Sequence, residues 1–342
     1  MKLVKNSMQK MSLSLRKIGF DNQTLLLIVI LVFLVATFGI TEDRFLSPTS
    51  VASMAVQLPE IGILSLAMMI PVMIGGINLS INATANLSAV MAGFFVMHVV
   101  PLITPQSNPV LTIASAILVA LLTGLLAGAL NGFLVGYIGA PPILATLATM
   151  GVFTGIAVGL TGGSSLTGFD PSIGLIGKEK LLGIPIPFLV FVGVAIITYL
   201  LLNYTTFGFR TRMMGTNPMA SKFSGINNKE IIMKDFILSG ILSSIAGILV
   251  MSRTMSASYQ YGASTYVTLT LLIYVLAGVV SGAGNVINIF ITVLILQVIS
   301  TGFHMLLVGI RGSAFFKDFV WGLLLVFILI INYFSQRSRQ RE

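Results

Sequence analysis

Apolar residues in this chain gather in long runs that end at charged residues or at proline and glycine. Most runs approach the roughly 20 residues that a helix needs to cross the hydrocarbon core of a bilayer. We therefore predict an all-α, polytopic integral membrane protein with about ten transmembrane helices. The predicted spans cover residues 23–40, 51–74, 80–100, 109–136, 141–160, 186–204, 235–253, 265–282, 286–303 and 316–335.

The amino-acid composition also indicates that lipid rather than water surrounds most of the chain. Apolar residues make up 56% of the 342 positions, charged residues make up 8%, and the mean hydropathy is +1.01. That leaves too few polar side chains to cover the surface of a soluble globule. We expect a basic N-terminal segment (1–22), one transmembrane domain (23–335) containing a polar loop at 205–234, and a basic tail (336–342).

Basic residues cluster at both ends of the chain and in the 205–234 loop, and the net charge is +9. Cytoplasmic loops of membrane proteins carry an excess of Lys and Arg. With ten crossings and a cytoplasmic N-terminus, all three clusters fall on the cytoplasmic side. We therefore predict cytoplasmic N- and C-termini, and we assign the positive charge to orientation rather than to a nucleic-acid partner.

Between the second and third spans, the run 75–82 combines helix-breaking glycines with capping side chains and contains no charge. Non-helical backbone at membrane depth is tolerated where protein buries it or water reaches it. One interpretation is therefore a substrate pathway, to which we assign Asn78, Ser80, Asn82 and, further along, Asn86. An equally good interpretation is a tight turn just inside the membrane.

Glycines recur every four residues in the fourth span, at 124, 128, 132 and 136, and predict close packing against another helix. Asn131 lies beside this seam and is a candidate polar contact. Thr146 and Thr149 share one face of the fifth span. Such threonines usually bond their own helix, so a pathway role for Thr146 is the second interpretation.

Glu60 lies within the second span, where a charge is expensive and a functional role is the default hypothesis. A substrate or gating role, a neutral side chain, and a side chain that reaches the outer surface all stay open. We find no second acid to partner it, and therefore place proton coupling last.

The central loop predicts a short helix over 217–225. Asn217 suits the N-cap, Pro218 the first turn, and Gly225 a left-handed stop. So short a helix is unstable in water and needs a surface to lie on. Met219 and Phe223, four residues apart, offer an apolar stripe to the membrane or to a partner protein.

The sequence contains no Walker A pattern and no histidine and glutamate spacing typical of a zinc site. We therefore expect no catalytic residue, metal or cofactor in this chain.

Several motifs occur together in this chain, namely Phe45-Leu46-Ser47, 75–80, 128–132, 142–147, 161–163, Phe207-Gly208, Asn217 and 224–226. As a set they resemble the membrane permeases of binding-protein-dependent ABC importers, specifically the ribose and autoinducer-2 type. This chain has Asn78 where the family usually has Asp, and Phe209 where it usually has Arg.

The resemblance implies a bacterial inner-membrane permease that works as a homodimer or heterodimer. It implies two cytoplasmic ABC ATPase subunits, which bind ATP and Mg²⁺, and a periplasmic or lipid-anchored binding protein that delivers a sugar-like solute. In the family the short central helix docks on the ATPase. On that basis the predicted coupling residues are Asn217, Pro218, Met219, Ala220, Ser221, Lys222, Phe223 and Gly225.

Two functional hypotheses follow from different classes. The first is the permease subunit of an ATP-driven importer for a monosaccharide or autoinducer-2. The second is a carrier driven by an ion gradient, for which Glu60 is the candidate ion site. An intramembrane enzyme would need a convergent nucleophile, base or metal ligands, and we find none in the sequence.

Overall fold

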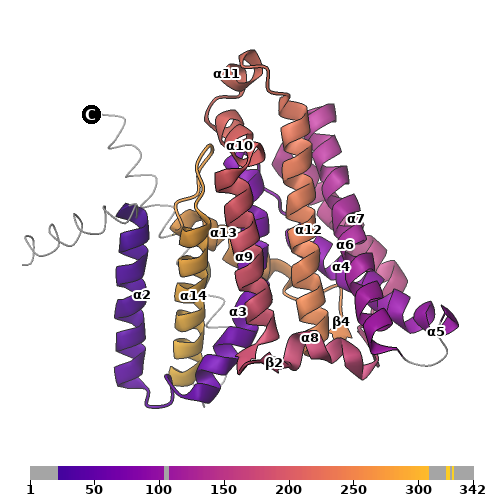
Figure 1. Ribbon diagram of the computed structural model, residues 1–342, viewed down its shortest axis with the longest axis vertical. Helices are drawn as coiled ribbons and strands as arrows, with labels where there is room; N and C mark the ends of the chain where they lie inside the picture. The colour runs from indigo at the N-terminus through magenta and orange to yellow at the C-terminus, as the bar shows by residue number, and fades with distance from the viewer. Residues whose placement is uncertain (1–21, 104–107, 308–320, 324–325, 327–342) are drawn as a thin grey trace, which may run out of the picture.

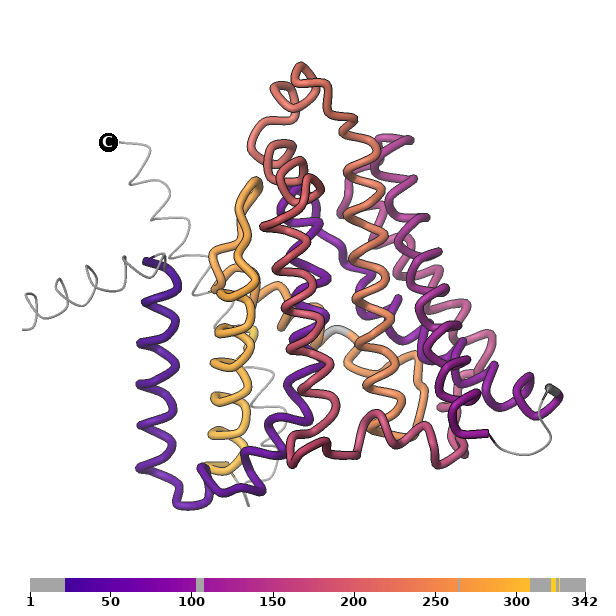
Figure 2. The backbone as a smooth tube through the Cα atoms, in the orientation of Figure 1, coloured from indigo at the N-terminus to yellow at the C-terminus, as the bar shows by residue number. Residues whose placement is uncertain are grey.

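The computed structural model describes residues 22–103, 108–307, 321–323 and 326. The predicted N-terminal segment (1–22, apart from Asn22), the tail (336–342) and nearly all of the predicted tenth span (316–335) lie outside these ranges. The described chain is helical, with four two-residue strands. Figures 1 and 2 show the long helices running roughly side by side, with short elements closing the lower end.

Eight helical segments of the described chain are long and apolar enough to cross a membrane. Seven correspond to the first seven predicted spans and one to the ninth. They are α2 (Asn22–Thr41), α3 (Pro48–Met73), α4 (Ile81–His98) continued by α5 (Val100–Ile103), α6 (Pro109–Phe133) continued by the π-helix η1 (Leu134–Ile138), α7 (Pro142–Thr161), α9 (Ile186–Tyr204), α12 (Asn228–Thr254) and α14 (Val286–Leu306).

The predicted eighth span differs from the structure. The helix α13 (Ala263–Leu276) has 14 residues, which at 1.5 Å per residue gives only about 21 Å. Gly278 and Gly282, both with positive φ, then turn the chain through a hairpin toward α14. An apolar run alone did not reveal that these glycines end the helix.

Helix α12 forms the centre of the bundle and packs against α3, α4 and α6 (Figure 1). The predicted glycine seam is confirmed. A Cβ on Gly124 or Gly128 would collide with the α12 backbone at Gly240 or Phe236, and one on Gly132 would lie 2.9 Å from the Cα of Met233. By contrast, α2 lies at the edge of the structure and packs against α14 through Leu27, Ile291 and Ile295.

The short elements lie at the two ends of the bundle. At one end, η2 (Pro171–Ile173), α8 (Gly174–Lys178) and two antiparallel strand pairs close the structure. Strand β1 (Leu166–Thr167) pairs with β4 (Ser256–Ala257), and β2 (Lys180–Leu181) pairs with β3 (Ile184–Pro185). At the other end, α10 (Thr206–Thr216) lies at the top of α9, and α11 (Pro218–Phe223) projects beyond the long helices (Figure 1).

Candidate functional site

The break between α3 and α4 is built from glycines that fit where a side chain would not. Gly75 has a φ of +81°, and a Cβ on Gly76 would lie 3.2 Å from the Cβ of Pro142. The chain therefore turns back tightly, and α4 begins beside the middle of α12. Asn78, in the turn, is 2% exposed and donates its amide to Ser239 on α12 at 3.0 Å.

Uncharged polar side chains form hydrogen bonds with the backbone and with one another at this break. The Asn78 side-chain oxygen accepts from the backbone N–H and the hydroxyl of Ser80, at 3.1 and 2.8 Å. Asn131 then donates to the Ser80 hydroxyl at 2.8 Å and accepts from Thr149 at 2.6 Å. We call Asn78, Ser80, Asn131, Thr146, Thr149 and Ser239 the amide network.

Thr146 joins this network through the backbone of the break. Its hydroxyl donates to the carbonyls of Ile77 and Pro142, at 3.1 and 2.8 Å, and accepts from the Leu79 N–H at 3.1 Å. The structure thus brings four predicted pathway residues, Asn78, Ser80, Asn131 and Thr146, into one buried cluster. Their bonds hold the broken backbone, and contact with a substrate stays a prediction for them.

Asn82 and Asn86 lie elsewhere, on the wall of a cavity of about 450 Å³ between α4, α7 and α13. Asn82 donates to the Tyr261 carbonyl at 3.1 Å, and Asn86 donates to the carbonyls of Tyr259 and Tyr261, both at 3.0 Å. These bonds fix the loop between β4 and α13. We call this space the asparagine cavity, and its other polar lining residues include Thr154, Tyr259, Gln260 and Thr268.

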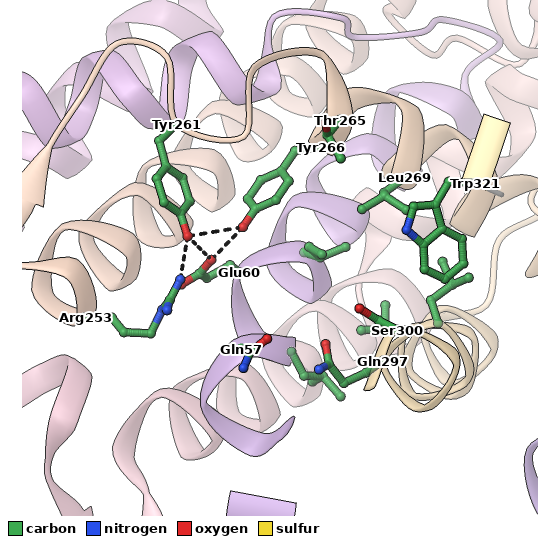
Figure 3. A pocket seen from close by; sticks show the side chains of 14 residues that line it. Gln57, Glu60, Arg253, Tyr261, Thr265, Tyr266, Leu269, Gln297, Ser300 and Trp321 are labelled. Carbon is green, nitrogen blue, oxygen red and sulfur yellow. Dashed lines mark hydrogen bonds and ion pairs between the residues drawn. The ribbon is translucent and has the colours of Figure 1, made fainter. Parts of the chain in front are cut away.

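Glu60 lies in a third place, within a charged cluster that the sequence analysis missed. Its side chain is 2% exposed and pairs with Arg253, near the end of α12. Its other oxygen accepts from the hydroxyls of Tyr261 and Tyr266, at 3.2 and 2.8 Å. We call these four residues the carboxylate centre; Figure 3 shows them along one side of a cavity of about 210 Å³.

One sequence signal pointed to this chemistry. Arg253 is a cation at the end of a predicted span, and intramembrane acids usually have a cationic partner. A separate acid, Asp235, opens the same predicted span and was not counted as an intramembrane acid. The structure corrects this, because Asp235 is fully buried and accepts from Thr211 on α10 at 3.1 Å.

The predicted short helix is confirmed as α11. The Asn217 side-chain oxygen accepts from the N–H groups of Met219 and Ala220, both at 3.0 Å, and Gly225 has the left-handed φ of +78°. The exposed fractions of Met219 and Phe223 are 62% and 84%. These two residues therefore present an uncovered apolar stripe.

One residue of the predicted coupling set faces inward. Ser221 is fully buried and donates to the Asn228 side chain at 2.9 Å, while Asn228 donates to the Pro218 carbonyl at 2.9 Å. This clamp ties α11 to the start of α12. Pro218, Ala220, Lys222 and Gly225 are exposed with the apolar stripe.

The hairpin before α14 connects α10 to the break after α3. Gly282 donates its N–H to the Met73 carbonyl at 2.8 Å, and Ser281 donates to the Gly215 carbonyl at 2.7 Å. A Cβ on Gly215 would collide with the backbone at Met73 and Gly282. The end of α10 therefore lies in direct backbone contact with the end of α3, where the helix break begins.

Comparisons with known proteins cover most of the chain. Residues 50–329 match the family described as branched-chain amino acid transport system / permease component. The chain is 33% identical over 195 residues to the ribose import permease protein RbsC of Bacillus subtilis, covering 56% of this chain and 59% of that protein. It is 30% identical over 200 residues to the L-arabinose transport system permease protein AraH of Escherichia coli, covering 58% and 60%.

A third relative is the autoinducer 2 import system permease protein LsrD of Yersinia enterocolitica, which is 28% identical over 177 residues, covering 50% of this chain and 54% of that protein. The chain thus spans about three fifths or less of the length of these curated relatives. No solved structure matches the chain with statistical significance.

Proposed function

Because the chain belongs to the branched-chain amino acid transport system / permease component family, we propose that it is the permease subunit of an ATP-driven importer for a sugar or a sugar-like polar solute. It is a multi-pass membrane protein, similar to permeases of bacterial inner membranes. The relatives are named for ribose, L-arabinose and autoinducer 2. These names support a polyhydroxylated solute rather than one particular sugar.

The observation that carries the proposal is the uncovered, capped helix α11. A helix of six residues is too short to be stable alone, yet this one is fixed by its Asn217 cap and by the Asn228 clamp. Its apolar stripe of Met219 and Phe223 faces outward. Such a surface fits a groove on a cytoplasmic ATPase subunit, which would bind ATP and Mg²⁺ and supply the energy.

The contacts of α10 give the route for that energy. Gly215 and the 278–284 hairpin hold the end of α3, and the helix break follows directly. Movement of α10 and α11 on the ATPase would shift the break and then α4, which carries Asn82 and Asn86. The solute pathway of this proposal is the asparagine cavity, with delivery by a binding protein and a second permease to complete the dimer.

The carboxylate centre weighs against a carrier driven by an ion gradient. Glu60 was the candidate ion site, but Arg253 already balances its charge and two tyrosine hydroxyls bind its second oxygen. A Na⁺ or proton site at Glu60 would need free capacity for the cation on that carboxylate, and these contacts occupy both of its oxygens.

The proposal is tested by Ala220→Arg, which places a long cation beside the exposed stripe of α11. We expect ATP-dependent solute uptake in proteoliposomes holding the whole importer to fall at least tenfold, while the purified assembly still hydrolyses ATP. Ala220→Ser, which keeps a small side chain at the same exposed position, is the matched control and keeps uptake. Full uptake by Ala220→Arg, or accumulation that needs an ion gradient and no ATP, contradicts the proposal.

A further inference from the structure

The cavity beside the carboxylate centre carries chemistry that the proposed pathway does not use. It is lined by α3, the end of α12, α13, α14 and Trp321. We propose that this cavity binds a neutral polyhydroxylated solute of monosaccharide size. This inference rests on the proposed function for the choice of solute, and it adds a second binding site beside the asparagine cavity.

The charges of the cavity select a neutral ligand. Arg253 and Glu60, the only cation and anion among the described lining residues, are paired with each other. A free cation, an anion or the zwitterionic end of an amino acid would have to break this buried pair. Removing one partner from a buried pair costs several kcal/mol, so charged ligands bind poorly here.

The cavity also contains polar groups that can form further hydrogen bonds. Trp321 is 3% exposed, and its ring N–H has no hydrogen-bond partner among the described residues. Figure 3 shows the indole across the cavity from Glu60, with its nitrogen on the edge nearer to that carboxylate. A buried donor without a partner costs free energy, and a ligand hydroxyl would satisfy it. Gln57, Gln297 and Ser300 add amide and hydroxyl groups to the wall.

Size and apolar lining agree with a sugar. The volume of about 210 Å³ far exceeds the 10–15 Å³ or so that one water needs. Leu269, Val293 and Leu296 line the cavity together with the aromatic rings. Ligand sites combine such apolar walls with a few directed polar groups. A monosaccharide presents both C–H faces and hydroxyls.

Tyr261 links this cavity to the asparagine cavity. Its hydroxyl bonds Glu60 and Arg253 on one side, while its carbonyl accepts from Asn82 and Asn86 on the other. A solute that contacts the carboxylate centre therefore acts on the loop that fixes the asparagines. Helix α13 contributes to the walls of both cavities, and Tyr261 lines one of them while its carbonyl holds two asparagines of the other.

The chain contains one tryptophan, and it lines this cavity, so its fluorescence reports ligand directly. The purified protein in lipid nanodiscs would be titrated with D-ribose, L-arabinose and D-galactose, with L-leucine as the zwitterionic comparison. We expect a saturable change in Trp321 emission with at least one sugar and none with L-leucine. Tyr266→Phe, which removes only a hydroxyl beside Glu60, should raise the dissociation constant about fivefold.

Thr123→Val on α6, a residue that lines neither cavity, is the matched control and should leave the titration unchanged. If Tyr266→Phe fails to fold by circular dichroism and gel filtration, Gln297→Met tests the same wall. The inference is overturned if no sugar gives saturation, if L-leucine saturates instead, or if folded wall variants bind as the parent does. The titration needs no ATPase or binding protein, so its result is independent of the uptake experiment.

Discussion

The amide network and the carboxylate centre differ in how completely their polar groups are paired. In the amide network, asparagine, serine and threonine side chains bind one another and the broken backbone. In the carboxylate centre, a balanced charge pair and two tyrosines border a cavity that also holds an indole N–H without a partner among the described residues. The first centre holds the fold, and the second has capacity left for a ligand.

The arrangement of hydrogen bonds in the amide network can be traced to a proline. Pro71 in α3 has no N–H to donate to the Ala67 carbonyl one turn earlier. The Ser239 hydroxyl donates to that carbonyl at 2.7 Å, so its oxygen must accept from another donor. Asn78 supplies that donor. The amide at position 78 therefore suits a serine that already donates to the carbonyl left free by Pro71.

The largest predicted effect comes from breaking the charge pair on one side. Arg253→Met leaves Glu60 as a buried, uncompensated carboxylate, and we expect the free energy of unfolding to fall by about 3–5 kcal/mol. Glu60→Gln should cost less, because the Arg253 side chain is 25% exposed and reaches water more easily. Denaturation in mixed micelles would measure both losses.

The double variant Glu60→Gln/Arg253→Met completes the comparison as its control. Since it removes both charges together, its loss should be clearly smaller than the sum of the two single losses. Additive losses would show that the pair is not coupled, and the carboxylate centre would then resemble two independent surface charges.

The second prediction puts a charge into the neutral centre. Asn78→Asp can donate to Ser239 only while the carboxyl keeps its proton, and the unfolded chain loses that proton readily at neutral pH. The folded variant then binds more protons than the unfolded one, so its stability falls as pH rises, by about 1.4 kcal/mol per pH unit. Between pH 5 and pH 7 we expect a loss of about 3 kcal/mol relative to the parent.

Thermal unfolding of Asn78→Asp and its parent at both pH values checks this slope. Asn203→Asp is the matched control, because Asn203 is exposed and accepts from Arg212 at 2.7 Å, a contact that a carboxylate also makes. A pH-independent Asn78→Asp variant would mean that Ser239 turns to the carboxylate, and that the Ala67 carbonyl tolerates losing its donor.

Elements set by local chemistry could be predicted from the sequence. Helix α11 follows from Asn217, Pro218 and Gly225, and the α6 seam follows from glycines every four residues. The early end of α13 was missed, because glycines within an apolar run do not by themselves end a helix. Chain composition likewise leaves open the total number of crossings and the side on which each terminus lies.

Contacts between distant residues could not be predicted in the same way. Glu60 and Arg253 are 193 positions apart, and no local pattern connects them. Asn131 and Ser80 were both candidates, but the sequence gave no reason to pair them across 51 positions. Residue types showed where polar groups enter the membrane, whereas the partner of each group depends on how α3, α4, α6 and α12 pack.

The smallest predicted effect separates the two centres by function. Thr149→Val keeps the side-chain shape but leaves the Asn131 oxygen without its 2.6 Å donor, and we expect about 1–2 kcal/mol of lost stability. Sugar titrations followed by Trp321 should not change, because Thr149 is not among the residues that line that cavity. Weaker sugar binding by a folded Thr149→Val protein would show that the amide network and the carboxylate centre act as one site. A centre whose polar groups all have hydrogen-bond partners would then not be purely structural.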